Sequence, residues 1–209
     1  GRQRRKEHKM RAFFAVAALL MLCGAAVAAA VGPPRPLILV PGLMGSILQK
    51  HTFATDRTQQ IFPLLVEQTS HIPDLYCACR MYEDDSGSLT DEDDDHLCHP
   101  PAPEEYEVVV PMDNYGLYAI DLLMPNELLE SNRKPYFHDM IAMLEEEHGY
   151  VPGETLFGFP YDWRQPTSHV AELLQDRVDE VLQATGAEQV DIVSHSLGCL
   201  VTQAYLSLP

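Results

Sequence analysis

A strand followed by a sharp turn and a helix is predicted around Ser196. Residues 190–193 form a short apolar run typical of a buried strand, and residues 199–206 have the composition of a buried helix. The turn between them can be tight only if the residues two positions before and after its centre are small. Those residues are Ser194 and Gly198. Such a turn lifts the Ser196 hydroxyl above the sheet, at the N-terminus of the next helix.

A serine raised on such a turn is placed for nucleophilic chemistry. In α/β-hydrolases this junction is called the nucleophile elbow, and it carries the catalytic serine. The helix dipole and the free N–H groups at the helix N-terminus favour the negative charge that develops when a carbonyl is attacked. The first glycine of the usual pattern is a serine here, which is still small. An ordinary strand, turn and helix containing serines is the alternative, so further motifs must decide.

The charge of the chain is strongly acidic and unevenly distributed. The 209 residues carry a formal net charge of −17, with 14 Lys and Arg against 31 Asp and Glu. Six of the 14 basic residues lie within residues 1–11, beside a single acidic residue, so the remainder is more acidic still. Such a surface repels nucleic acid, and we predict no nucleic-acid partner. The length allows one domain with a sizeable hydrophobic core.

The N-terminal segment has the features of a secretory targeting sequence. Residues 12–31 contain no charged side chain, are rich in Ala, Leu, Val and Phe, and follow the basic residues 1–11. Their alanine-rich end offers several A-x-A cleavage sites, which predicts a signal peptide over residues 1–30. An uncleaved signal anchor is the alternative. Both place residues 31–209 in the secretory pathway, secreted or luminal after cleavage and membrane-anchored without it.

The cysteines are compatible with an oxidising compartment. Three of the five, Cys77, Cys79 and Cys98, fall in one loop region, where an oxidising lumen allows a disulfide that joins Cys98 to Cys77 or to Cys79. Cys199 follows the predicted turn and is expected to be buried. The spacing of the loop cysteines is too irregular for zinc, so we predict no metal site.

A second predicted strand, over residues 37–40, leads into a loop that contains two glycines. The loop is Pro-Gly-Leu-Met-Gly-Ser, residues 41–46. In an α/β-hydrolase the loop after an early strand donates one N–H to the oxyanion hole, and the residue after the nucleophile donates the other. The glycines let the backbone bend so that a main-chain N–H points at the substrate carbonyl oxygen. The predicted donors are therefore the N–H groups of Leu43 and Leu197.

Strands and helices are predicted to alternate over much of the remaining chain. Residues 51–105 are the least regular part, and their acidic runs with Gly, Ser and Pro predict a surface insertion over the site or a mobile loop outside the core. A strand-like run follows at residues 106–110, and a further strand is predicted at residues 154–159. An amphipathic helix is predicted over 135–148, and another begins at a Thr167 or Ser168 cap and ends at Gly186. The apolar faces of these two helices are predicted to comprise Phe137, Met140, Ile141 and Leu144 in the first, and Val170, Leu173, Leu174, Val178, Val181 and Leu182 in the second.

This alternation predicts an α/β fold with a parallel sheet. In such sheets the loops at the carboxyl ends of the strands line the site. The loop that contains Leu43, the loop 160–164 and Ser196 are therefore expected at the same edge of the sheet.

Three motifs, taken in order, resemble those of one known family. Residues 159–164, Phe-Pro-Tyr-Asp-Trp-Arg, resemble the PYDWR signature of the lecithin:cholesterol acyltransferase family, which includes lysosomal phospholipase A2 and phospholipid:diacylglycerol acyltransferases. Residues 41–46 are similar to the oxyanion loop of this family, and residues 194–199 are similar to its nucleophile elbow. Each motif is modest alone, but the three together are specific.

The resemblance covers residues 36–50 and 106–206, and it implies a fold and an activity. Residues 113–121 and 136–140 are most similar to plant and protist acyltransferase-like phospholipases. The implied enzyme is an α/β-hydrolase that takes an acyl group from a glycerophospholipid onto serine and passes it to water, a sterol or another lipid alcohol. This mechanism requires no cofactor. The implied partners are phospholipid, a lipid acyl acceptor and a membrane or lipoprotein surface, and the lysosome or vacuole is one implied compartment.

The predicted insertion departs from the family pattern. In the family a disulfide-closed lid near the oxyanion loop carries a tryptophan that engages lipid. Cys98 with Cys77 or Cys79 would close a similar lid-like loop here, within 51–105. Its interior is acidic, however, and the only tryptophan of the chain is Trp163. The residues of this loop therefore do not support the lipid-binding role that the family lid has.

A catalytic triad is incomplete in these residues. A serine nucleophile needs a base and a carboxylate that orients the base, and in this fold both follow the serine in the chain. None of the thirteen residues after Ser196 is Asp, Glu or His. His195 is a poor base because its side chain is directed away from its neighbour, and Asp162 is expected to pair with Arg164 as a loop anchor. We therefore expect the N-terminal half of an α/β-hydrolase, which lacks normal turnover by itself.

Two other functions remain open at this point. One is a neutral lipase or a small-ester esterase with the same elbow and oxyanion loop. The other is a non-catalytic module that holds a lipid in the hydrolase cleft. The motifs favour catalysis, because a binding module does not need a serine on so tight a turn.

Overall fold

The computed structural model describes residues 34–63, 82–83, 89–90, 106–123 and 135–209. The chain divides into two units, Gly1–Pro34 and Arg35–Pro209, and every element described below belongs to the second. No helix within the described ranges is long and apolar enough to cross a membrane. The predicted targeting segment 1–30 and the three loop cysteines lie outside the described residues and stay predictions.

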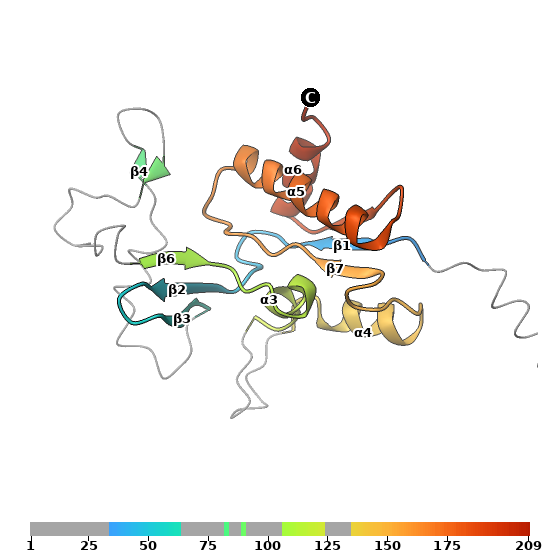
Figure 1. Cartoon of the computed structure of the whole chain (residues 1–209), viewed down its shortest axis with the longest axis horizontal. Coiled ribbons are helices and arrows are strands. Elements are labelled where there is room, and N and C mark those ends of the chain that lie inside the picture. Colours follow the sequence, from blue (N-terminus) through green and yellow to red (C-terminus); the bar gives the residue numbers. More distant parts are fainter. Residues whose placement is uncertain (1–33, 64–81, 84–88, 91–105, 124–134) are drawn as a thin grey trace, which may run out of the picture. The chain divides into compact units, whose positions relative to one another are not determined.

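A parallel three-stranded sheet forms the centre of the second unit. Strand β1 (Leu37–Val40) lies between β7 (Leu156–Gly158) and β8 (Asp191–Ser194). Figure 1 shows β1 beside β7. Val40 is in register with Ser194, and Leu39 is in register with Gly158, so the three strands end at one edge. The prediction of a mixed α/β structure with parallel strands is confirmed.

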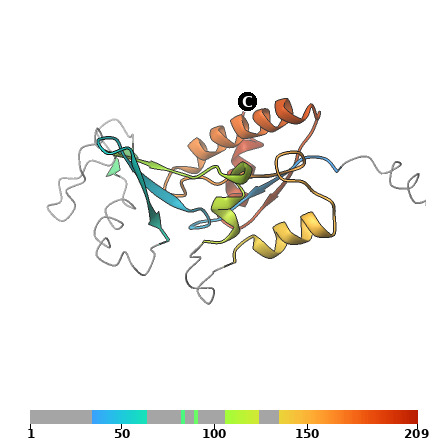
Figure 2. The same cartoon turned by 60° about the horizontal axis from the view of Figure 1, so that its bottom comes forward.

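Helices cover both faces of this sheet because β1 is apolar at every position. Side chains alternate between the faces of a strand. Ile38 and Val40 pack in one cluster with α5 (Thr167–Thr185) and α6 (Leu197–Tyr205). Leu37 and Leu39 pack in another cluster with α3 (Tyr118–Asp121) and α4 (His138–Glu146). Figure 2 shows α5 and α4 on opposite sides of β1.

A second sheet is antiparallel, and it corrects one expectation. It consists of β2 (Leu48–Thr52), β3 (Arg57–Phe62) and β6 (Tyr106–Val109), in the order β3-β2-β6. The prediction of irregular structure from residue 51 is therefore wrong for residues 51–62. The sequence did not predict these strands because they are largely polar: in β3 only Ile61 is buried, and the first three residues are exposed. The remaining described elements are the short pair β4 (Tyr82–Glu83) and β5 (Leu89–Thr90) and the 3-10 turn η2 (Asn114–Gly116).

The two long helices lie where the sequence predicts them, with local differences. Helix α5 ends at Gly186 in the left-handed conformation, as expected. The helix already begins at Thr167, so its N-cap is Pro166. Neither Thr167 nor Ser168 makes the predicted side-chain cap. Met140 is 37% exposed and Leu173 is 39% exposed, so the predicted apolar faces of the two helices wrongly included these residues.

The last strand and helix are less buried than predicted. Val193 of β8 is 38% exposed, and Leu200 of α6 is 55% exposed. Within the described residues β8 pairs only with β1, which leaves its other side uncovered there. Helix α6 turns Gly198 and Val201 toward the core, so Cys199 is on another face and is exposed, contrary to the prediction.

A histidine on β2 is held between two carboxylates. His51 Nε2 lies 3.0 Å from Asp56 Oδ1, and His51 Nδ1 lies 3.2 Å from Glu107 Oε1. Both ring nitrogens donate when the imidazole is protonated. These two hydrogen bonds, the one to Asp56 above all, raise the pKa of His51 above its ordinary value of 6.5.

We therefore predict a pH-dependent contribution of His51 to stability. A raised pKa in the folded state stabilises the fold fully at pH below 6.5, and this stabilisation is lost as the pH rises through the folded pKa. The difference in free energy of unfolding between the wild type and His51→Gln should therefore shrink over that rise. Urea unfolding at a series of pH values measures it. A difference that stays constant with pH would contradict the prediction.

Candidate active site

Ser196 sits at a strained turn between β8 and α6. Its backbone angles are φ 53° and ψ −120°, a combination that residues with a Cβ rarely adopt. His195 N–H still donates to Val40 O at 3.0 Å, so β8 stays paired with β1 up to the turn. Helix α6 begins at Leu197, directly after the serine. The backbone thus has the form of a nucleophile elbow, and the Ser196 residue is exposed.

Two glycines allow the close packing around this turn. A Cβ on Gly198 would lie 2.4 Å from Pro41 O, so the start of α6 can approach the end of β1 only without a side chain there. A Cβ on Gly42 would lie 2.8 Å from Ser196 Cβ. The loop after β1 is therefore in direct contact with the turn that carries Ser196, at the edge of the sheet where the sequence predicted both.

Among the described residues, the N–H groups of the two predicted oxyanion donors have no hydrogen-bond acceptor. Leu197 is the first residue of α6, where N–H groups have no partner within the helix. Neither its N–H nor that of Leu43 donates to any other described residue. Nearby N–H groups do have acceptors. Gly45 N–H donates to Gly42 O at 3.0 Å, and Gly198 N–H donates to His195 O at 2.9 Å. The roles of Leu43 and Leu197 remain predictions.

Tyr136 connects the loop to the turn. Its Oη accepts a hydrogen bond from Gly42 N–H at 2.8 Å and lies 2.7 Å from His195 Nδ1. The His195 side chain therefore points to Tyr136, and the expectation that His195 is not the base stays a prediction. Burial raises the pKa of Tyr136, only partly offset by the Gly42 N–H, so the phenol stays protonated.

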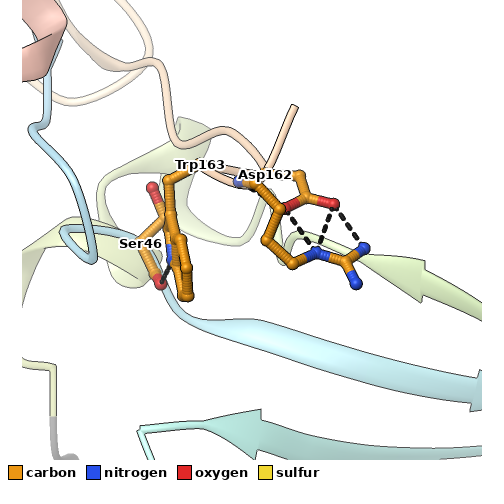
Figure 3. A network of polar contacts seen from close by, with 4 residues as sticks. Ser46, Asp162 and Trp163 are labelled. Carbon is orange, nitrogen blue, oxygen red and sulfur yellow. Dashed lines mark hydrogen bonds and ion pairs between the residues drawn. The ribbon is translucent and has the colours of Figure 1, made fainter. Parts of the chain in front are cut away.

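The loop 160–164 braces the loop after β1. Tyr161 N–H donates to Ser46 Oγ at 3.1 Å, and Tyr161 Oη donates to Pro41 O at 3.0 Å. Trp163 Nε1 donates to Ser46 O at 3.3 Å, as Figure 3 shows. Burial raises the pKa of Tyr161, so its hydroxyl remains a donor. Both ends of the 41–46 loop are thus fixed by one motif.

Asp162 and Arg164 form a pair inside the same loop. Arg164 donates to both carboxylate oxygens of Asp162, with an Nη2–Oδ2 distance of 2.6 Å, and both side chains are largely buried. Asp162 also accepts the backbone N–H of Arg164 at 3.0 Å. This is the loop anchor that the sequence suggested. Within the described ranges no group of three or more His, Cys, Asp and Glu could hold a metal ion.

The sequence interpretation missed the residues that support the site. Tyr136 had no assigned role, although it lies 94 residues from Gly42 in the chain and contacts it directly. Ser46 and Tyr161 belong to the predicted motifs, but the sequence assigned no role to either side chain. The presence of Tyr161 and Ser46 in two separate motifs was the only signal that could have suggested a contact between the motifs.

Comparison with known proteins identifies the family. The family model described as lecithin:cholesterol acyltransferase matches residues 103–208, which is just over half of the chain. The chain belongs to the lecithin:cholesterol acyltransferase family. The matched segment of this acyltransferase-family chain contains β7, β8, Tyr136 and Ser196.

Curated relatives extend the similarity beyond that segment. The chain is 28% identical to "Lecithin-cholesterol acyltransferase-like 4" of Arabidopsis thaliana over 177 residues, 83% of this chain and 30% of that protein. It is 33% identical to "Phospholipase A(1) LCAT3" of Arabidopsis thaliana over 180 residues, 83% of this chain and 37% of that protein. It is 27% identical to "Lysosomal phospholipase A and acyltransferase" of Canis lupus familiaris over 205 residues, 90% of this chain and 45% of that protein. The chain therefore spans less than half the length of these relatives.

Proposed function

We propose that this chain is part of a lipid O-acyltransferase or phospholipase A of the α/β-hydrolase fold, with Ser196 as its nucleophile. The observation that carries the proposal is the backbone of Ser196, at φ 53° and ψ −120° between β8 and α6. Strain of this kind has a use at a reacting group and none in an ordinary connection. The names of the relatives, which include phospholipase A(1) and lysosomal phospholipase A and acyltransferase, support a phospholipid as acyl donor.

The proposed reaction begins with attack of Ser196 Oγ on the ester carbonyl carbon of the phospholipid. As the Oγ–C bond forms, a base removes the hydroxyl proton, and the carbonyl oxygen becomes an oxyanion that accepts hydrogen bonds from the Leu43 and Leu197 N–H groups. The C–O bond to the lysophospholipid then breaks, and the leaving oxygen takes the proton. In the second half, water or a lipid alcohol attacks the acyl carbon and the base takes its proton. The bond between Oγ and the acyl carbon then breaks, the fatty acid or new ester leaves, and Ser196 Oγ takes back the proton.

The base and its carboxylate are proposed to come from a part of the protein that corresponds to the stretch of the relatives that this chain does not match. The matched relatives are more than twice as long as the stretch that they share with it. We do not assign His195 as the base, because it directly precedes Ser196 in the chain and its ring is held against Tyr136. Asp162 is unsuitable because Arg164 occupies both of its carboxylate oxygens.

The surroundings of Ser196 suit an apolar substrate. Leu43 is 59% exposed and Met44 is 48% exposed, both on the loop that contacts the serine turn. Exposed apolar side chains at this place support contact with acyl chains at a membrane or lipoprotein surface. The predicted signal segment 1–30, the lid-like insertion within 51–105 and a secreted or luminal location, lysosomal or vacuolar included, belong to the same proposal.

Acyl release from phosphatidylcholine vesicles tests the proposed function. The protein that contains this chain, expressed with the base and the carboxylate present, should release fatty acid from vesicles faster than from p-nitrophenyl butyrate. It should leave an acyl group on Ser196 that mass spectrometry can locate, and adding cholesterol or diacylglycerol to the vesicles reveals transfer. Preference for the short ester would favour an esterase. Lipid binding without labelling by a fluorophosphonate would favour a non-catalytic module.

A further inference from the structure

Tyr136 occupies a position that neither the elbow nor the oxyanion loop accounts for. Its backbone is fixed to the end of α3, because Tyr136 N–H donates to Asp121 O at 3.0 Å and Phe137 N–H donates to Ile120 O at 3.1 Å. Its ring packs on the bare backbone of Gly45, where a Cβ would lie 2.8 Å from Tyr136 Cε1. The phenol is thus held by the fold before any substrate arrives.

The Tyr136 hydroxyl joins the two halves of the candidate site. It accepts the N–H of Gly42, the residue next to Leu43, at 2.8 Å. On the other side it meets Nδ1 of His195, the residue next to Ser196, at 2.7 Å. The rings of Tyr136 and His195 also make an edge-to-face contact, with centroids 5.6 Å apart. Each half of the site is therefore tied to the same oxygen atom.

The donor and acceptor roles of the Tyr136 hydroxyl can be inferred from its two partners. Gly42 N–H is a donor, so the Tyr136 oxygen accepts from it. Among the described residues, Nδ1 of His195 is the only acceptor in hydrogen-bonding contact with Tyr136 Oη. We infer that the neutral phenol donates to Nδ1, which places the proton of a neutral His195 ring on Nε2.

We propose that Tyr136 is a positioning residue of the oxyanion hole, which fixes the loop that presents Leu43 N–H against the turn that presents Leu197 N–H. The proposal rests on the proposed function, because it assigns a role to those two donors. By engaging Gly42 N–H, Tyr136 leaves the next N–H of the loop to face the reacting carbonyl. Oxyanion donors contribute when they are preorganised, so the hydroxyl should act on the transition state more than on substrate binding.

Tyr136→Phe tests this proposal, since it removes one oxygen atom and keeps the ring on Gly45. We expect kcat on phosphatidylcholine to fall about 10- to 100-fold, with KM changed less than about twofold. The affinity for a trifluoromethyl ketone, which forms a tetrahedral adduct with serine, should fall by the same factor as kcat/KM. Tyr150→Phe is the matched control, because Tyr150 packs partly buried in the same cluster and no hydrogen bond of its hydroxyl is seen among the described residues.

A double variant separates positioning from a general loss of structure. If Tyr136 acts through one network with His195, then Tyr136→Phe/His195→Ala should be no slower than the more impaired single variant. Additive losses would overturn the proposal. So would a wild-type kcat in Tyr136→Phe, measured in an assay in which the wild type is active and Ser196→Ala is inactive. A loss in Tyr136→Phe that appears only as raised KM or as a lower melting temperature would also overturn it.

One measurement needs no activity, and it separates this proposal from the proposed function. In protein with ¹⁵N-labelled histidine, His195 should show the Nε2–H form with a hydrogen-bonded Nδ1, and the Nδ1 shift should move in Tyr136→Phe. His195→Ala assigns the signal. If the wild type releases no acyl group yet shows this signature, the proposed function fails while the network stands. A protonated Nδ1 in neutral His195, or a shift unaffected by Tyr136→Phe, refutes the network.

Discussion

Replacing Ser196 by alanine is expected to reduce acyl release from phosphatidylcholine by a factor on the order of 10⁶. The substitution removes the oxygen atom that bonds to the acyl carbon, and no other described hydroxyl shares its position at the start of α6. The Leu43 and Leu197 N–H groups would remain, so only the weak residual catalysis of the oxyanion hole would persist. Fatty acid release and labelling by a fluorophosphonate should disappear together.

The control for this prediction is Ser207→Ala. Ser207 is exposed after the end of α6, and its hydroxyl donates to Gln203 O at 2.9 Å, away from the turn. This variant should keep wild-type release and labelling. Circular dichroism should show that both variants are folded. Activity retained in Ser196→Ala, or fluorophosphonate attached to another serine of the wild type, would refute the assignment of the nucleophile.

The parallel part of the fold could be predicted from local sequence. The run Leu37–Val40 is apolar at four successive positions, which is typical of a strand covered on both faces, and β1 is the middle strand. Gly186 ends α5 because only a residue without a Cβ adopts a left-handed conformation easily there. Ser196 could be placed at the turn because small residues on both sides are a purely local requirement. Such features depend on few neighbours, so the sequence reveals them.

The remaining features depend on contacts between distant residues. The strand Arg57–Phe62 buries only Ile61 fully, so its polar sequence lacks the alternation that marks a half-buried strand. Cys199 and Leu200 are apolar residues on an exposed face of α6, where composition alone suggested a core. The contact of Tyr136 with His195 joins residues 59 apart in the chain. No periodic pattern records a contact of this kind.

Gly198→Ala is expected to lower the free energy of unfolding by about 2 kcal/mol, against the usual effect of alanine in a helix. Helix propensity alone would favour alanine by about 1 kcal/mol. At this position, however, the new methyl group would lie 2.4 Å from Pro41 O and 2.7 Å from Val40 O, both backbone atoms of β1 and its loop. Such overpacking costs about 3 kcal/mol, because backbone cannot move aside as a side chain can. Overpacking therefore outweighs propensity.

The same substitution should also impair the candidate site. Helix α6 must shift away from β1 to accept the methyl group, and it carries Ser196 at its N-cap and Leu197 at its first turn. A displacement of about 1 Å lowers turnover about 100-fold. Urea unfolding and the rate of fluorophosphonate labelling measure the two effects.

Gly149→Ala separates crowding from the loss of a glycine as such. A Cβ on Gly149 would meet no atom within 4 Å, but the residue has φ +68°, so alanine there should cost about 1 kcal/mol through backbone strain alone. Its labelling rate should stay at the wild-type value, because the residue follows α4 and contacts neither loop of the site. Equal losses of stability with normal labelling in both variants would mean that α6 tolerates a side chain at Gly198. The close approach of α6 to β1 would then not be what holds Ser196 in its strained conformation.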